Sequence, residues 1–438
     1  MPGPPVDREL LRLAVPALGA LIAEPLYVLA DTAVVGHLGT EPLGGLAVAS
    51  AALLLGYNVC IFLAYGSTAA VARLMGAGHH DKAAHQAVQG LWLALALGVA
   101  LAAIGAATAE PLLRALGAGD EVLDQALTYF RVSLLGAPGM LLMLAGVGYL
   151  RGIKDTVRPL WVGVGTAVLN LAVELVLIYG FGLGIGASAA ATVVAQWLGA
   201  GFYLWWIGRA VRDHHVGLRP DPATIRRLVV VGADLLVRTV SLVGTFALAT
   251  AVAARIGTVD VASHQIAFQA WMLLALTMDA MAIAAQTMVG NLLGAGLADE
   301  ARRIGHRVLA WSVGLGATLG AVLIGVLVGA DGVLPGVFSA DPAVVALAGF
   351  LLLHVAAMAP LSGLAFGLDG ILIGAGDQRY LARAMGISFA VFAPAAVIGH
   401  TLGAGIGWLW GAIWLFMVVR SALLAARFRG SRWQVVGA

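Results

Sequence analysis

Residues 343–374 read AVVALAGFLLLHVAAMAPLSGLAFGLDGILIG. Asp369 is the only charged residue in this run. The run is longer than the roughly 20 apolar residues that an α-helix needs to cross about 30 Å of hydrocarbon. It therefore predicts a membrane-spanning helix.

Similar runs recur along the whole chain. Of the 438 residues, 61% are hydrophobic and 11% are charged, whereas a soluble domain has about 25% charged residues. The 58 glycines are typical of helices that pack closely in lipid. We predict an all-α polytopic membrane protein with twelve transmembrane helices, of which the other eleven lie at about 10–36, 46–72, 88–109, 126–150, 160–180, 184–208, 227–255, 263–293, 307–330, 384–402 and 404–427.

The basic residues predict the orientation of these helices, because cytoplasmic loops carry an excess of Lys and Arg. If both termini are cytoplasmic, 21 of the 25 Lys and Arg residues fall on the cytoplasmic side, and Arg420 is one of these 21. The exceptions are Arg114 and Arg255 on the outer side and Arg131 and Arg238 within spans. We expect an integral protein of the plasma (inner) membrane with both termini cytoplasmic.

The two halves of the chain resemble each other. VARLMGAGHHDKAAHQ at 71–86 and VGNLLGAGLADEARRI at 289–304 share the pattern L-x-G-A-G-x-x-D. Each half has an even number of spans, so the repeats have the same orientation, which is one plan of secondary transporters. We predict two pseudo-symmetric six-helix bundles, with the cation-coupling lobe at 8–208, a cytoplasmic linker at 209–226, the second bundle at 227–427 and a cytoplasmic tail at 428–438.

The energy source is expected to be an ion gradient. A phosphate-binding loop of the form G-x-x-x-x-G-K-[ST] does not occur, because the only lysines, Lys82 and Lys154, are followed by Ala and Asp. We therefore expect no cofactor, no enzymatic activity and no nucleic-acid partner. The expected partners are the lipid bilayer and a small substrate, and nothing requires more than a monomer.

The first span contains EPLYVLADTAVVGHLG. Glu24, Tyr27 and Asp31 have spacings of three and four residues and therefore share one helical face. An ionisable side chain within a span costs at least about 2.5–3.5 kcal/mol at the bilayer centre and indicates function. Pro25 removes a backbone hydrogen bond and favours a kink, so it is the predicted hinge. Asp31 is the predicted proton carrier.

The fifth and sixth spans supply further polar groups. Asn170 and Glu174 are four residues apart, and Thr192 offers a hydroxyl group. Together with Asp31, they could bind a proton, or Na⁺ as a hard cation that prefers oxygen ligands. The equivalent of Asp31 in the second half is Ala249, so we expect the ion site only in the first half. Polar contacts between helices are the alternative interpretation.

The second half has its own polar residues within spans. Gln265, Met272, Asp279 and Gln286 follow one another at seven-residue spacing, and Asp369 lies further along the chain. We interpret them, with Glu24, as candidates for the wall of a substrate cavity. Buried hydrogen bonding between helices is the alternative.

These motifs resemble the multidrug and toxic compound extrusion (MATE) family, in its DinF-like branch. The resemblance rests on ADTAVVGHLG in the first span, on GYLRGIKDT at 148–156 and on SHQIAFQAWMLLALTMDAMAIAAQTMVGNLLGAG at 263–296. It implies two six-helix bundles that export organic cations in exchange for H⁺ or Na⁺. It also implies a first-lobe cation site at Asp31, Asn170, Glu174 and Thr192, with Tyr27 nearby. The family commonly has Asp where this chain has Glu174.

The predicted function is export of amphiphilic or cationic drugs or toxins by antiport with H⁺, with Na⁺ as the alternative ion. Asp31, Asn170, Glu174 and Thr192 would be metal ligands only in a Na⁺-coupled carrier. A flippase for lipid-linked precursors, from the same superfamily, is the alternative function. It would need a strongly cationic cavity, whereas Arg131 and Arg238 are the only bases predicted within spans.

Overall fold

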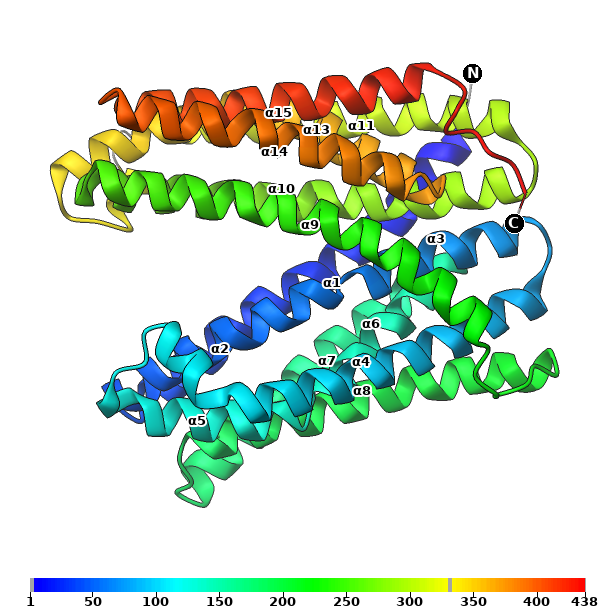
Figure 1. The fold of residues 1–438 in the computed structure, drawn as a ribbon, viewed down its shortest axis with the longest axis horizontal. Coiled ribbons are helices and arrows are strands. Elements are labelled where there is room, and N and C mark those ends of the chain that lie inside the picture. Colours follow the sequence, from blue (N-terminus) through cyan, green and yellow to red (C-terminus); the bar gives the residue numbers. More distant parts are fainter. Residues whose placement is uncertain (1–3, 330–332, 438) are drawn as a thin grey trace. The chain divides into compact units, whose positions relative to one another are not determined.

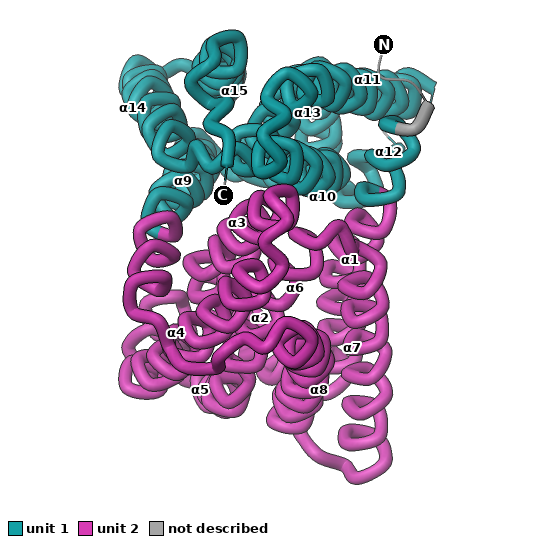
Figure 2. The backbone as a smooth tube through the Cα atoms, turned by 90° about the vertical axis from the view of Figure 1, so that its right-hand side faces the viewer, with its two compact units in different colours: residues 1–14, 233–437 teal, residues 15–232, 438 magenta. Residues whose placement is uncertain are grey.

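The computed structural model describes residues 4–329 and 333–437. All regular elements in these two ranges are helices (Figure 1). The chain divides into two compact units, which Figure 2 colours separately: unit 1 comprises residues 1–14 and 233–437, and unit 2 comprises residues 15–232. Two helices, α1 (Pro4–Gly36) and α9 (Pro222–Ile256), contribute to both units.

Unit 2 holds most of α1, the start of α9 and the helices between them. Helix α3 continues the direction of α2, and α6 continues α5 after a bend, whereas short turns reverse the chain after α3 and after α4 (Figure 1). The helices are α2 (Thr40–Cys60), α3 (Phe62–Gly76), α4 (His80–Ala115), α5 (Asp120–Leu134), α6 (Ala137–Gly152), α7 (Val157–Leu175), the π-helical turn η1 (Val176–Gly180) and α8 (Ile185–Asp213).

Unit 1 holds most of α9 and the remaining helices. Helix α13 packs against α10, α11 and α15. These helices are α10 (Thr258–Gly294), α11 (Ala298–Gly329), α12 (Val333–Gly336), α13 (Pro342–Gly374), α14 (Gln378–Thr401) and α15 (Ile406–Arg429).

The lengths of the helices match the bilayer. Among the described residues, 11 helical segments are long and apolar enough to cross a membrane, with α2 and α3 together forming one of them. Helices α5 and α6 form a twelfth candidate that is bent by 50°. The prediction of an all-helical polytopic membrane protein is therefore confirmed.

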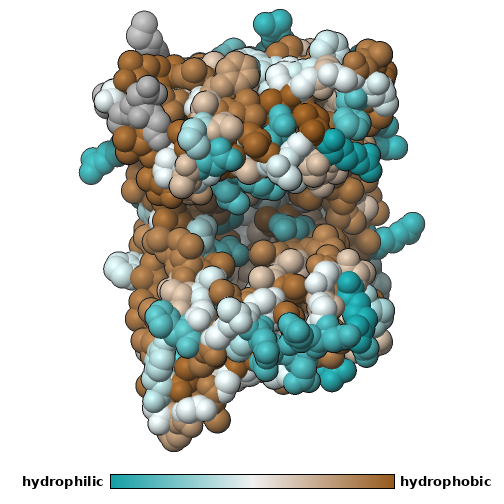
Figure 3. Space-filling model, turned by 90° about the vertical axis from the view of Figure 1, so that its left-hand side faces the viewer, coloured by the Kyte–Doolittle hydropathy of each residue, from teal (hydrophilic) through white to brown (hydrophobic). Residues whose placement is uncertain are grey.

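Large apolar side chains lie on the outside of the helices. Leu29, Ile104, Val168 and Leu273 are each more than 60% exposed, an arrangement that suits contact with lipid rather than with water. Figure 3 looks at one end of the helices and shows hydrophobic residues along much of the flanks and hydrophilic residues gathered on the end itself.

Glycine allows close helix contacts in unit 1. A Cβ atom on Gly370 of α13 would lie 2.4 Å from the Ala282 carbonyl oxygen of α10. One helical turn further, a Cβ atom on Gly374 would lie 2.4 Å from the Gln286 carbonyl oxygen. These two backbones therefore touch, as small residues permit in membrane helices.

The segment after α8, residues 214–221, folds back onto α4. The Trp92 indole donates to the Leu218 carbonyl at 2.9 Å, and the Gln89 side chain accepts from the Asp221 N–H at 2.8 Å. The Asp221 carboxylate accepts from the Thr224 hydroxyl at 2.6 Å and from the Ala223 N–H at 3.0 Å. These hydrogen bonds, chiefly that of Thr224, lower the pKa of Asp221 and cap the start of α9.

The C-terminal residues fold back across unit 1 in a similar way. The Trp433 ring is buried and stacks on Phe428. Arg302 of α11 donates to the Gln434 side chain at 2.6 Å, and Gln434 donates to the Ala298 carbonyl at 2.8 Å. The segment that follows the last helix of unit 1 is therefore fastened to the start of α11.

Candidate functional site

Helix α1 carries three polar side chains in unit 2, of which Asp31 is buried, Tyr27 is half-buried and Glu24 is exposed. Glu24, Tyr27 and Asp31 lie along one face, and Pro25 lies inside the helix between them. Because proline has no N–H, the backbone bond to Leu21 is missing at this point. The helix is therefore locally weakened within two turns of Asp31.

The Tyr27 hydroxyl joins α1 to α7 and α8. It lies 2.8 Å from Thr192 Oγ1 and 3.4 Å from Asn170 Nδ2. The Asn170 amide donates to Thr192 Oγ1 at 2.8 Å, and the Thr192 hydroxyl donates to the Ser188 carbonyl at 3.2 Å. Since the Thr192 proton is used in that bond, Tyr27 is the donor to Thr192.

Asp31 and Glu174 form a pair of buried carboxyl groups. Asp31 is 4% exposed and Glu174 is fully buried. The Ser188 hydroxyl donates to Asp31 Oδ1 at 2.6 Å, and the Asp31 and Glu174 carboxyls lie close enough to interact electrostatically. No N–H or O–H group among the described residues is placed to donate to the Glu174 oxygens in good geometry. Ionising two neighbouring buried carboxyls at once is unfavourable, which makes this pair suited to holding a proton.

The backbone changes character directly after this pair. Helix α7 ends at Leu175, one residue past Glu174, and continues as the π-helical turn η1. Single π-helical turns within helices are rare and often occur at functional sites. The amide of Asn170 and the carboxyl of Glu174 project one helical turn apart, immediately before this irregularity.

A cavity of about 500 Å³ lies within unit 2 beside this cluster. Glu24, Tyr27, Asp31, Asn170 and Thr192 all line it, whereas Glu174 does not. The rest of the lining is mainly apolar and aromatic, and it includes Tyr57, Tyr65, Tyr129, Tyr203, Met140 and Met143. This is a typical composition for a small-molecule site, in which a few polar groups orient a largely apolar ligand.

The predicted residues of the second half do not line this cavity. Gln265 and Met272 of α10 are exposed, Asp279 is half-buried and Gln286 is buried. Asp369 of α13 is 1% exposed and lies inside unit 1. All five residues belong to unit 1, and none of them lines the cavity of unit 2.

Asp369 is instead the centre of an ion cluster. Arg238 of α9 and Arg420 of α15 each donate to Asp369 Oδ2 at 2.5 Å. Arg420 is fully buried, so its assignment to the cytoplasmic loops was wrong. The sequence places Arg420 near the end of an apolar run, and only the packing of α15 against α13 reveals that it points inward.

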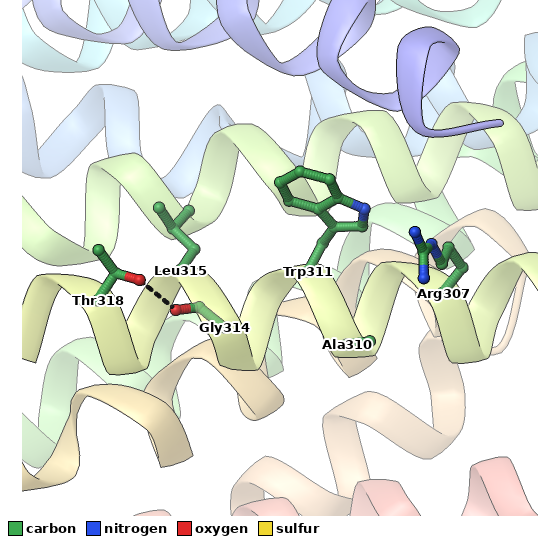
Figure 4. Close-up of a pocket in the computed structure, with 6 residues that line it drawn as sticks. All are labelled: Arg307, Ala310, Trp311, Gly314, Leu315 and Thr318. Carbon is green, nitrogen blue, oxygen red and sulfur yellow. Dashed lines mark hydrogen bonds between the residues drawn. The ribbon is translucent and has the colours of Figure 1, made fainter. Parts of the chain in front are cut away.

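A second pocket, of about 410 Å³, lies along α11 (Figure 4). It is lined by Arg307, Ala310, Trp311, Gly314, Leu315 and Thr318. The Arg307 guanidinium binds both carboxylate oxygens of Asp7 at 2.7 and 2.6 Å, and the Trp311 indole donates to the same carboxylate at 2.9 Å. Because the charge of Arg307 is already balanced by Asp7, this pocket offers no free ion-binding group.

Ser188 is the main site residue that the sequence did not reveal. It is fully buried and donates to Asp31. It lies one helical turn before Thr192 on α8, so the i, i+4 spacing was a usable signal. Tyr129 also lines the cavity and could have been found only from the packing of α5.

Comparison with known proteins identifies the relatives of this chain. The family model described as MatE matches residues 16–176 and 235–398. Protein DETOXIFICATION 44, chloroplastic, from Arabidopsis thaliana is 32% identical over 442 residues, which cover 97% of this chain and 82% of that protein. DNA damage-inducible protein F from Escherichia coli is 27% identical over 429 residues, which cover 97% of this chain and 92% of that protein.

Solved structures share the fold. The crystal structure of MATE in complex with MaL6 has a TM-score of 0.86 at 22% identity and covers 98% of this chain and 97% of that one. A mutant of the Vibrio cholerae MATE transporter VcmN has a TM-score of 0.87 at 18% identity and covers 97% of this chain and 96% of that one.

Fold, cavity and relatives together define an integral membrane transporter rather than an enzyme. The chain belongs to the MATE family. The resemblance inferred from the sequence motifs is thereby confirmed.

Proposed function

We propose that this chain is a proton-coupled antiporter that exports amphiphilic or cationic small molecules. The observation that carries the proposal is the buried Asp31–Glu174 carboxyl pair beside a cavity of about 500 Å³. Two facing carboxyls bind one proton readily, because ionising both in the same place is unfavourable.

The proton is coupled to substrate through α1. When the pair takes up a proton, the charge at Asp31 changes, and with it the hydrogen bond from Ser188 and the repulsion from Glu174. Pro25 lies within two turns of Asp31, so α1 can respond by bending there. Tyr27 lies on the same face and contacts Thr192, so bending would rearrange the cavity wall and release the substrate outward.

Na⁺ is the alternative coupling ion. The Glu174 oxygens and Asn170 Oδ1 are buried and accept no N–H or O–H hydrogen bond in good geometry from the described residues. With Asp31 and Thr192 they would give a hard cation the oxygen ligands that it prefers. No group of three or more His, Cys, Asp or Glu residues in the described part of the chain is arranged to hold a metal ion, so such a site would depend on neutral oxygens.

The arginines of unit 1 do not favour the lipid-linked precursor flippase. Arg238 and Arg420 are both bound to Asp369, so their charge is partly compensated. The distribution of Lys and Arg supports an orientation with both termini cytoplasmic.

The test is efflux of rhodamine 6G from proteoliposomes under an imposed pH gradient or an imposed Na⁺ gradient. We expect efflux driven by the pH gradient in the wild type and none above background in Asp31→Asn. Asp124→Asn removes an exposed carboxylate of α5 and should leave efflux unchanged. Efflux that responds only to Na⁺ would assign the cluster to that ion. Normal pH-driven efflux in Asp31→Asn would refute the proposal.

A further inference from the structure

The end of unit 2 where α7 begins and α8 ends is rich in basic residues. These two helices pack against each other and are joined at their other end by the short connection 181–184. Residues 154–158 read KDTVR and residues 209–213 read RAVRD. The two segments hold four basic and two acidic residues, which leaves an excess of two positive charges at this end.

The acidic residues compensate the arginines only in part. Arg158 Nε lies 3.2 Å from Asp155 Oδ2, yet half of the Arg158 side chain is exposed. Arg209 Nε lies 3.9 Å from Asp213 Oδ2, and an exposed pair at this distance contributes little. Arg212 is exposed and makes no ion pair with a residue that the structure describes. The arginines of this end are therefore available to an external anion.

An exposed tryptophan lies one helical turn inside the arginine on each helix. Trp161 follows Arg158 by three residues and Trp205 precedes Arg209 by four, so each shares a helix face with its arginine. Trp161 is 67% exposed and Trp205 is 56% exposed. Phe202, a turn further inside on α8, is exposed as well. Apolar side chains, tryptophan and then arginine follow one another where a helix passes from hydrocarbon into the headgroup region.

The indole N–H groups of these two tryptophans have no acceptor within the described part of the chain. Trp92, Trp197 and Trp408 are also exposed, but their indoles donate to backbone carbonyl oxygens at 2.8–2.9 Å. Trp161 and Trp205 donate to no residue that the structure describes. An indole is a donor only, so both groups are free to bind the oxygens of a lipid.

We propose that this end of α7 and α8 binds the headgroup of an anionic phospholipid. A guanidinium group matches the geometry of phosphate, and basic pockets between transmembrane helices bind anionic headgroups. The Arg158 guanidinium lies over the Trp206 ring of α8 at 5.4 Å, so it extends from α7 toward the helix that carries Arg209. These two arginines contact the phosphate, and Trp161 and Trp205 donate to the glycerol ester oxygens. The lipid is not transported, so this proposal does not depend on the proposed antiport.

Native mass spectrometry of the purified full-length protein in detergent can measure the binding of the first lipid molecule. Phosphatidylglycerol and phosphatidylcholine with identical acyl chains differ only in their headgroups. We expect the wild type to bind phosphatidylglycerol about 20-fold more tightly, because each arginine should contribute about fivefold. Arg158→Gln/Arg209→Gln should abolish this preference. Arg209→Gln alone should reduce it about fivefold, and it removes only a marginal contact within the protein.

Two further variants test the parts of the site separately. Trp161→Phe/Trp205→Phe keeps the aromatic surface and loses both N–H groups, so it should weaken both lipids equally, because both contain the same ester oxygens. Arg379→Gln/Arg383→Gln is the matched control, since it removes two exposed arginines of α14 and should keep the preference for phosphatidylglycerol. Unchanged binding of both lipids in the tryptophan variant would overturn the role of the indoles.

Three results would overturn the lipid site itself. The first is a wild-type preference in the double arginine variant of α7 and α8. The second is an equal loss of preference in the α14 control, which would show a general effect of charge. The third is displacement of phosphatidylglycerol by inorganic phosphate where chloride at the same ionic strength has no effect, which would assign the arginines to a free anion.

Discussion

Three buried carboxylates of this chain have different neighbours, and the neighbours decide what each can do. Asp31 lies beside another acid, Glu174, and accepts a hydrogen bond from the Ser188 hydroxyl. Asp369 is surrounded by two guanidinium groups, of Arg238 and Arg420. The first arrangement favours exchange of a proton, whereas the second holds a permanent charge and ties α9, α13 and α15 together.

The substitution Asp369→Asn tests the structural role of the second arrangement. It removes the carboxylate that the buried guanidinium groups of Arg238 and Arg420 share, which should destabilise the protein by about 3–5 kcal/mol. Thermal unfolding of the purified protein in detergent would measure this as a large fall in Tm. Asp31→Asn removes one of two facing acids and should leave Tm close to that of the wild type.

Asp124→Asn controls for the loss of any single carboxylate, because Asp124 is exposed. A Tm for Asp369→Asn equal to that of the control would show that the ion cluster does not hold unit 1 together. In that case Asp369 would be a candidate for transport rather than for structure.

Much of the site could be predicted from residue spacing. Asp31 and Asn170 were found because charged and amide groups are rare within spans, and Tyr27 because it shares a helical face with Asp31. Thr192 was found from its hydroxyl group and from the family resemblance. Ser188 was not found, since serine is common wherever membrane helices pack closely. Whether the Arg420 side chain points into unit 1 depends on the rotation of α15 about its own axis, and the hydrophobic pattern of one span does not determine that rotation.

At the scale of helices, close packing depends on particular glycines. Gly370 approaches the backbone of α10, where a Cβ atom would lie 2.4 Å from a carbonyl oxygen and 2.6 Å from the Ala282 Cα atom. Backbone atoms cannot move aside as a flexible side chain can. Gly370→Ala should therefore destabilise unit 1 by about 1–3 kcal/mol, as overpacking of a tight core does.

Gly386→Ala provides the matched comparison, because nothing lies within 4 Å of the Cβ position on Gly386 of α14. In the same thermal unfolding measurement it should be neutral or slightly stabilising, since alanine favours the helix. Equal Tm values for the two variants would contradict the close contact between α10 and α13.

The spans themselves were predictable, because each depends only on the length of an apolar run. The bend between α5 and α6 was not predicted, although the sequence carries a signal for it. Gly136 lies between the two helices and Pro138 lies in the first turn of α6, where a proline without an N–H is tolerated. The Gln196 side chain of α8 occupies the space that a Cβ atom on Gly136 would need, and that contact could not be read from the sequence.

At the scale of the whole chain, the internal repeat extends to the segments that follow each set of helices. Residues 214–221 are fastened to α4 in unit 2, and the C-terminal residues are fastened to α11 in unit 1. In the sequence repeat, residues 71–86 and 289–304 include the starts of α4 and α11. In each unit, the returning segment and the repeat motif therefore meet at the same end of the helices.

This arrangement leads to a prediction about sidedness. The turns 77–79 and 295–297 and the segment 214–221 should be cytoplasmic, because Arg and Lys cluster beside them. The turn 116–119 and residues 339–341 should face outward. Cys60 is the only cysteine and is buried, so single introduced cysteines can be labelled in intact cells with a membrane-impermeant maleimide.

Gly119→Cys in unit 2 and Ala340→Cys in unit 1 should react in intact cells, whereas Gly217→Cys and Leu297→Cys should react only after permeabilisation. All four positions are exposed, so differences in labelling report the side of the membrane rather than burial. The reverse pattern would place both termini outside. It would also reverse the direction of proton transfer through the Asp31–Glu174 pair, because the cavity has a fixed orientation relative to the turns of unit 2. Opposite results for the two units would contradict a repeat with parallel orientation, since an even number of spans in each half requires Gly119 and Ala340 to lie on the same side.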